Sequence, residues 1–144
     1  MILPDVNVLI YAFRRDSEDH ERYKDWLESV VNGPTAYGIA PQVLSGVVRI
    51  CTHPRIFRRP SSRADAFTFC RTLLEQSNAT VTVPGARHWS IFEDLCGKAK
   101  STGNLVQDAW FAALAIESGC EWITTDRDYA RFPGLNWREP LGSP

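Results

Sequence analysis

The chain has 144 residues, of which 44% are hydrophobic and 23% charged, the composition of an ordinary globular domain. This length suits a single domain over residues 1–144, and a formal net charge of -1 does not by itself indicate a nucleic-acid partner. No apolar run reaches the roughly 18 residues that span a bilayer, and the N-terminus lacks a secretory signal, so we expect a cytoplasmic protein.

The first half of the chain alternates short apolar runs with helical patterns. Apolar residues recur at helical spacing up to the stop at Asn32-Gly33-Pro34, and Ser62 with Asp65 three residues later has the spacing of a capping box. We expect strands at residues 1–3 and 35–39, and helices at residues 6–13, 23–31, 43–51 and 62–74.

The second half continues the alternation. We expect strands at 80–83 and 121–124, a short strand at 136–138, helices at 88–99 and 109–118, and a turn at 101–104. Strands that are separated by helices form parallel sheets covered on both faces. The sequence therefore predicts an α/β fold, a three-layer α/β/α sandwich around a parallel sheet of four or five strands.

Three acidic residues are expected at one edge of this sheet. Asp5 follows the first strand, Asp126 follows the strand at 121–124, and Asp108 lies at the start of the helix that leads into that strand. Ligands of parallel sheets bind outside the carboxyl ends of the strands. Converging carboxylates repel one another unless a cation joins them, and a hard divalent ion such as Mg²⁺ or Mn²⁺ suits an all-oxygen site. Such an ion supports phosphodiester hydrolysis by an activated water.

Each acid also has a structural explanation. Asp5 suits a helix N-cap, Asp108 a first-turn acid that favours the helix dipole, and Asp126 a turn residue. The common edge of the sheet favours a metal site over three independent structural roles. The four cysteines and three histidines show no zinc-ligand spacing, so a site of that type is not supported.

Three segments carry a resemblance to a known family. They are DVNVLIYA at 5–12, RICTHPRIF at 49–57 and NLVQDAWFAALAIESGCEWITTDRDYARFPG at 104–134. In this order they resemble the PIN-domain family, above all VapC-type toxins of bacterial toxin–antitoxin systems in their actinobacterial and mycobacterial form. The resemblance implies a PIN-like fold and a Mg²⁺- or Mn²⁺-dependent endoribonuclease that cleaves structured RNA. It also implies a homodimer and a VapB-type antitoxin whose C-terminal segment blocks the site.

The resemblance also assigns roles to individual residues. Asp5, Asp108 and Asp126 match the family's metal-binding catalytic acids, Asn7 and Thr125 match positions that support them by hydrogen bonds, and Asp128 matches a further acid that a surface turn explains equally well. Gly46 stands where many PIN domains carry a glutamate, and no Asp or Glu occurs between Glu28 and Asp65. Three principal acids then remain instead of four, which weakens the case for a second cation.

Basic residues gather in one stretch of the chain. Arginines occupy positions 49, 55, 58, 59 and 63, with no acid among them. Arginine's planar guanidinium matches phosphate geometry, so Arg49, Arg55, Arg58 and Arg59 are candidates to hold the RNA backbone. A solvated loop and contacts with the antitoxin are the alternatives.

A second class of function stays open from the sequence. A PIN-like module that lacks the glutamate could bind RNA or a protein partner without nuclease activity. Receiver and haloacid-dehalogenase folds are disfavoured, because the first strand is followed by a single acid and no lysine lies beyond Lys100.

Overall fold

The computed structural model describes residues 1–142 and contains one parallel sheet. Its strands are β1 (Ile2–Pro4), β2 (Tyr37–Ile39), β3 (Ala79–Val81), β4 (Glu121–Ile123) and β5 (Trp137–Arg138). They lie in the order β3-β2-β1-β4-β5, and every neighbouring pair is parallel. The predicted parallel sheet is confirmed, and β1, which directly precedes the candidate acid Asp5, lies at its centre.

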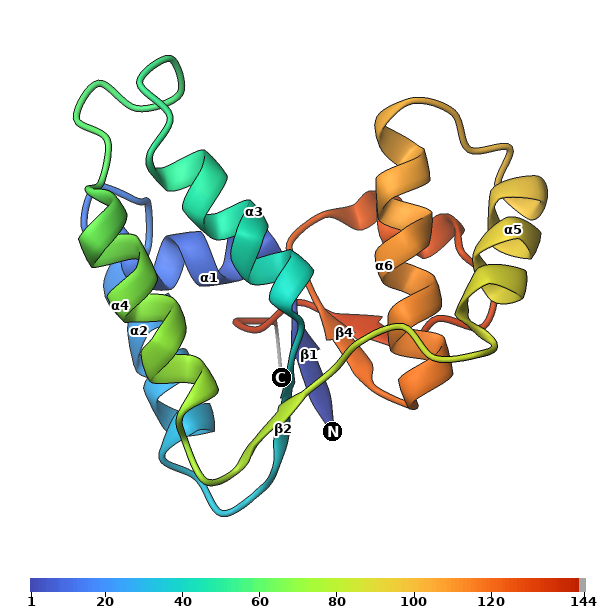
Figure 1. Cartoon of the computed structure of the whole chain (residues 1–144), viewed down its shortest axis with the longest axis horizontal. Helices are drawn as coiled ribbons and strands as arrows, with labels where there is room; N and C mark the ends of the chain where they lie inside the picture. Colours follow the sequence, from blue (N-terminus) through green and yellow to red (C-terminus); the bar gives the residue numbers. More distant parts are fainter. Residues whose placement is uncertain (143–144) are drawn as a thin grey trace.

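Helices form two groups on either side of the sheet (Figure 1). One group comprises α1 (Val6–Phe13), α2 (His20–Val31), α3 (Pro41–Cys51) and α4 (Arg63–Leu74); the other comprises α5 (His88–Lys98) and α6 (Asn104–Ser118). Helix α1 packs on α2 and α3, α3 packs on α4, and α5 packs on α6. The predicted three-layer sandwich is therefore confirmed. Among residues 1–142, no helix is long and apolar enough to cross a membrane.

The core lies between the central strands and the helices. Leu3, Ile39 and Trp122 are buried strand residues, and Trp122 stacks on Phe111 of α6 with ring centroids 5.4 Å apart. The Tyr37 hydroxyl donates a hydrogen bond of 2.6 Å to a carbonyl oxygen of α4. Apolar burial of this kind is the main stabilising contribution, and it fixes the carboxyl edge of the sheet where the acids lie.

The expected helix boundaries are confirmed at several points, and others differ, since α2 begins at His20 and α3 at Pro41 instead of 23 and 43. Helix α1 spans the expected residues, and the Ser62 hydroxyl accepts the backbone N–H of Asp65 at 3.0 Å as the N-cap of α4. Helix α6, however, begins at Asn104, so Asp108 lies in its second turn and not at its start. The start at Asn104 has no side-chain cap and follows Gly103 with a positive φ of 59°, while Leu105 extends the apolar stripe of Ala109 and Ala112.

Candidate active site

Asp5 joins the end of β1 to the start of α1. Its backbone N–H donates to the carbonyl oxygen of Ile123 in β4 at 2.8 Å, so the residue is fixed between two central strands. Its side chain is buried and acts as the N-cap of α1, with Oδ1 accepting the N–H of Val6 at 2.6 Å. Its Oδ2 accepts the hydroxyl of Thr124 at 2.7 Å. The capping role and a place in a polar site therefore coexist in one carboxylate.

Asp126 is connected to Asp5 through the same threonine. The Thr124 hydroxyl oxygen accepts the backbone N–H of Asp126 at 3.0 Å while its proton goes to Asp5. The Asp126 carboxylate in turn caps the short 3₁₀ helix η1 (Arg127–Arg131) by accepting the N–H of Asp128 at 2.9 Å. The turn after β4 thus holds the second acid at the edge of the sheet where Asp5 lies.

Asp108 is connected to the turn after β4 by Tyr129. The hydroxyl of Tyr129 in η1 donates to Oδ1 of Asp108 at 3.3 Å. Tyr129 is buried and packs on Trp122 and Phe132, so its ring holds the hydroxyl in place from within the core. The second turn of α6 thereby delivers its acid to the same region as the other two.

Two of the three acids, Asp5 and Asp108, have a raised pKa. Burial raises the pKa of Asp5 to about 6, and the negative charges of Asp108 and Asp126 add to this rise. Burial also raises the pKa of Asp108, followed by the charge of Asp126. Within residues 1–142, none of the three carboxylates forms an ion pair with a basic side chain. We call these acids, together with Thr124 and Tyr129, the carboxylate site.

The carboxylate site has the chemistry of a site for a hard cation. In the described part of the chain, no three His, Cys, Asp or Glu side chains lie close enough together to enclose a metal ion as they stand. The donors are nevertheless all carboxylate oxygens, which Mg²⁺ and Mn²⁺ prefer, and within residues 1–142 no ion pair with a basic side chain offsets their mutual repulsion. The chemistry of these donors therefore suits a divalent ion.

The supporting residues differ in part from those expected. The hydroxyl that bonds Asp5 belongs to Thr124, whereas Thr125 and Asn7 form no side-chain hydrogen bond within residues 1–142. The strand β4 ends at Ile123 with Thr124 fully buried beyond it, so the inward position falls one residue earlier than expected. Asp128 is exposed and lies 3.4 Å from Arg131, as a surface turn residue would.

Two members of the carboxylate site, Thr124 and Tyr129, were missed by the sequence analysis. Side chains of a strand alternate between its two faces, and this alternation along residues 121–124 was the available signal that Thr124 points inward. The signal is weak, because Trp122, Ile123 and Thr124 are all buried. Nothing local marks Tyr129, because its partner Asp108 lies 21 residues away in the sequence.

Gly46 has a packing role of its own. A Cβ atom at this position would lie 3.0 Å from Cγ2 of Val6, the residue that follows Asp5. Contacts that short force the neighbouring side chain to move. The absence of a side chain lets α3 approach the first turn of α1 closely, so a glutamate here would require Val6 to shift.

The basic stretch lies apart from the sheet edge, at the outer end of α3 (Figure 1). Arg49 is in the last turn of α3, and Arg55, Arg58 and Arg59 belong to the following loop, residues 52–62, which we call the basic loop. All four side chains are on exposed residues, and none forms an ion pair within residues 1–142. Their charge is therefore free to meet an anionic partner.

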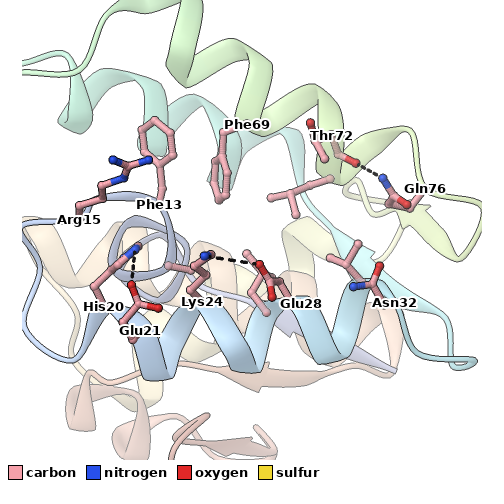
Figure 2. Close-up of a pocket in the computed structure, with 14 residues that line it drawn as sticks. Phe13, Arg15, His20, Glu21, Lys24, Glu28, Asn32, Phe69, Thr72 and Gln76 are labelled. Carbon is pink, nitrogen blue, oxygen red and sulfur yellow. Dashed lines mark hydrogen bonds and ion pairs between the residues drawn. The ribbon is translucent and has the colours of Figure 1, made fainter.

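A cavity of about 770 Å³ opens elsewhere, between the end of α1, α2 and α4 (Figure 2). Phe13, Leu27 and Phe69 give it apolar walls, and charged side chains such as the pair Lys24 and Glu28 border it. None of the three candidate acids lines it. This cavity and the carboxylate site are thus separate features of the surface.

Comparison with known proteins agrees with this fold. The PIN domain matches residues 2–135. VapC ribonuclease Mb2897 of Mycobacterium bovis is 40% identical over 141 residues, covering 98% of this chain and 96% of that protein. Ribonuclease VapC25 of Mycobacterium tuberculosis is 36% identical over 140 residues, covering 97% and 99%. The chain belongs to the PIN domain family, and within it to the VapC-type ribonuclease toxins.

Solved structures share the fold at lower sequence identity. A chain in the structure of VapBC-1 from nontypeable Haemophilus influenzae aligns with a TM-score of 0.71 and 18% identity, covering 99% of this chain and 100% of that one. A chain in the structure of VapBC2 from Rickettsia felis bound to a promoter DNA fragment aligns with a TM-score of 0.71 and 17% identity, covering 96% and 98%.

Proposed function

We propose that this VapC-type toxin is a Mg²⁺- or Mn²⁺-dependent endoribonuclease that hydrolyses phosphodiester bonds in structured RNA in the cytoplasm. The observation that carries the proposal is the group of Asp5, Asp108 and Asp126, in which burial and then the neighbouring acids raise the pKa of Asp5 and Asp108 and no member forms an ion pair within residues 1–142. The ribonuclease names of relatives at 36–40% identity favour this enzyme over a PIN-like module that only binds RNA or protein.

The residues of the site divide into two roles. Asp5, Asp108 and Asp126 would hold the ion, which when bound supplies an activated water and positive charge for the phosphate. Thr124 and Tyr129 orient these carboxylates by hydrogen bonds to Asp5 and Asp108. Asn7, Thr125 and Asp128 remain proposed supporting residues, because each lies within two residues of a member of the carboxylate site.

The basic loop and Arg49 would hold the RNA. Four exposed arginines without ion pairs, Arg49, Arg55, Arg58 and Arg59, offer planar donors for phosphate oxygens. Contacts to phosphate supply affinity and register but read no sequence. Selection of the scissile bond must then come from the shape of the RNA at the carboxylate site.

We also propose two protein partners. A VapB-type antitoxin, whose C-terminal segment would block the carboxylate site, is supported by the VapBC names of the structural relatives. A homodimer is consistent with the exposed aromatic side chain of Trp89. Light scattering of the isolated chain measures its mass directly, and a monomer would contradict the dimer.

The test is cleavage of RNA by the purified protein with Mg²⁺ or Mn²⁺, comparing the wild type with Asp5→Ala and Asp108→Ala. We expect metal-dependent cleavage that falls about a thousandfold or more in each variant, because an acid that holds the ion is lost. Asp94→Ala is the matched control, since Asp94 is an exposed acid paired with Lys98 on α5. Cleavage that survives in either site variant, or a wild type that binds RNA without cutting it, would overturn the proposal.

A further inference from the structure

Arg14, directly after α1, is buried despite its charge, and its side chain contacts four other residues. Its Nε and Nη2 donate to the two carboxylate oxygens of Asp16 at 2.9 and 2.6 Å. Its Nη1 donates to the hydroxyl of Ser61 at 2.9 Å, and Nη2 also donates to the carbonyl oxygen of Arg59 at 3.0 Å. Its guanidinium carbon lies 3.7 Å from the ring centroid of Phe57. We call this set of contacts the Arg14 clamp.

Three of the four partners of Arg14 belong to the basic loop. Phe57, Arg59 and Ser61 come from residues 52–62, whereas Asp16 is local to the end of α1. The loop is also closed at its base, where the N–H of Ser61 donates to the carbonyl oxygen of Cys51 at 2.8 Å. Arg14 therefore does not join the exposed basic surface. Its guanidinium instead donates hydrogen bonds to the loop that carries Arg55, Arg58 and Arg59.

Helix α1 connects the clamp with the carboxylate site. Asp5 is its N-cap and Arg14 its C-cap, with eight helical residues between them. We propose that Arg14 is a positioning residue, which fixes the basic loop at a set place relative to Asp5 so that bound RNA meets the carboxylate site in one register. The inference rests on the proposed RNA-binding role of the basic loop. Lysine cannot substitute, because an ammonium lacks the planar fork that meets Asp16 and the loop together.

The first arm of the test measures the loop without RNA. In native Arg14→Gln protein, we expect trypsin to cleave after Arg55 and Arg58 about tenfold faster than in wild type, since hydrogen bonds to a charged group are lost. Arg15→Gln is the matched control, because it removes the same charge one residue along and should leave the rate unchanged. Arg14→Lys should behave like Arg14→Gln. Equal rates in wild type and Arg14→Gln, or an equal rise in Arg15→Gln, would overturn the clamp.

Ser61→Ala serves where Arg14→Gln does not fold. It removes one donor–acceptor pair on the loop side, keeps the bond from the Ser61 N–H to Cys51, and should speed the same cleavages by about fivefold. A Ser61→Ala rate equal to that of wild type in folded protein would count against the clamp.

The second arm measures RNA cleavage. For Arg14→Gln we expect the KM for RNA to rise about tenfold with kcat nearly unchanged, and cuts to spread to neighbouring phosphodiester bonds, because a loose loop no longer fixes the register. A faster trypsin cleavage with unchanged KM and cut pattern would overturn the positioning role while leaving the clamp in place. If Arg58→Ala/Arg59→Ala protein also kept its KM, the RNA-binding role of the loop would itself be wrong.

Discussion

Helix α1 has a carboxylate at each end, and the two carboxylates have opposite surroundings. Asp5 at the start is buried, forms no ion pair within residues 1–142, and its pKa is raised to about 6, mainly by burial and further by the charges of two acids. Asp16, just beyond the end, is exposed and bonded to Arg14, which lowers the pKa of its carboxyl. The surroundings thus disfavour the ionised form of the Asp5 carboxyl at one end of the helix and favour the ionised form of the Asp16 carboxyl at the other.

This contrast separates function from stability. A buried charge without a partner is destabilising, and a protein retains one where another need requires it. The carboxylate site holds one buried acid, Asp5, beside the partly buried Asp108 and Asp126, whereas the Arg14 clamp pairs its buried cation and leaves the arginines of the basic loop exposed. The end of α1 at Arg14 holds the basic loop in place. The end at Asp5 belongs to the group of acids that would bind an ion.

The largest expected effect is a gain of stability on removing the charge of Asp5. Asp5→Asn keeps an oxygen for the N–H of Val6 and removes the buried negative charge. Because the folded pKa is above the unfolded value of 3.8, the wild type loses stability as pH rises from about 4 to about 6. In chelator at pH 7.5 we therefore expect Asp5→Asn to be more stable by about 3 kcal/mol in urea unfolding, with the difference vanishing near pH 4.

Asp16→Asn provides the opposite sign at the other end of α1. Its folded pKa is lowered, so the stability that Asp16 contributes is present above its unfolded pKa and is lost as pH falls below it. The variant should be less stable than wild type at neutral pH and equal to it in acid. A stability of Asp5→Asn equal to or below that of wild type at pH 7.5 would remove the contrast between the two ends.

A smaller effect is expected at Gly46, where α3 meets the start of α1. Alanine would gain about 1 kcal/mol in helix propensity, but its Cβ would lie 3.0 Å from Val6 Cγ2. We expect Gly46→Ala to lower the free energy of unfolding by about 1 kcal/mol, because the overpacking exceeds the propensity gain. In a Val6→Ala background the same change should instead be stabilising. The double-mutant cycle measures this coupling, and additive effects would show that Gly46 is not required for the close approach.

Much of the fold could be predicted from periodicity, because apolar spacing and turn residues mark buried strands and amphipathic helices locally. The start of α6 could not, since Asn104 lacks a side-chain cap and the chain enters the helix through the positive φ of Gly103. Sequence signals for helix starts depend on capping residues, and here the apolar stripe through Leu105 replaces them.

The carboxylate site shows the same limit at the level of single residues. Asp5 and Asp126 could be placed at one edge because parallel strands end together, and Asp108 because its helix leads into β4. The partners Thr124 and Tyr129 depend on side-chain direction and on contacts across the chain, which no local pattern carries. Arg14 is the plainest example, since it stands next to Arg15 in the sequence but is buried by residues 57–61.

The last expected effect concerns the exposed charges of the basic loop. Replacing Arg58 and Arg59 together by alanine should weaken RNA binding about tenfold and lower the slope of log K against log salt by about 1.5, because each lost phosphate contact removes part of the counterion release. Arg22→Ala/Lys24→Ala is the matched control, since both residues lie on α2 in ion pairs with Asp19 and Glu28. A salt slope that does not change in the loop variant, or that changes equally in the control, would mean that the loop arginines hold no phosphate. The basic loop would then be a solvated surface.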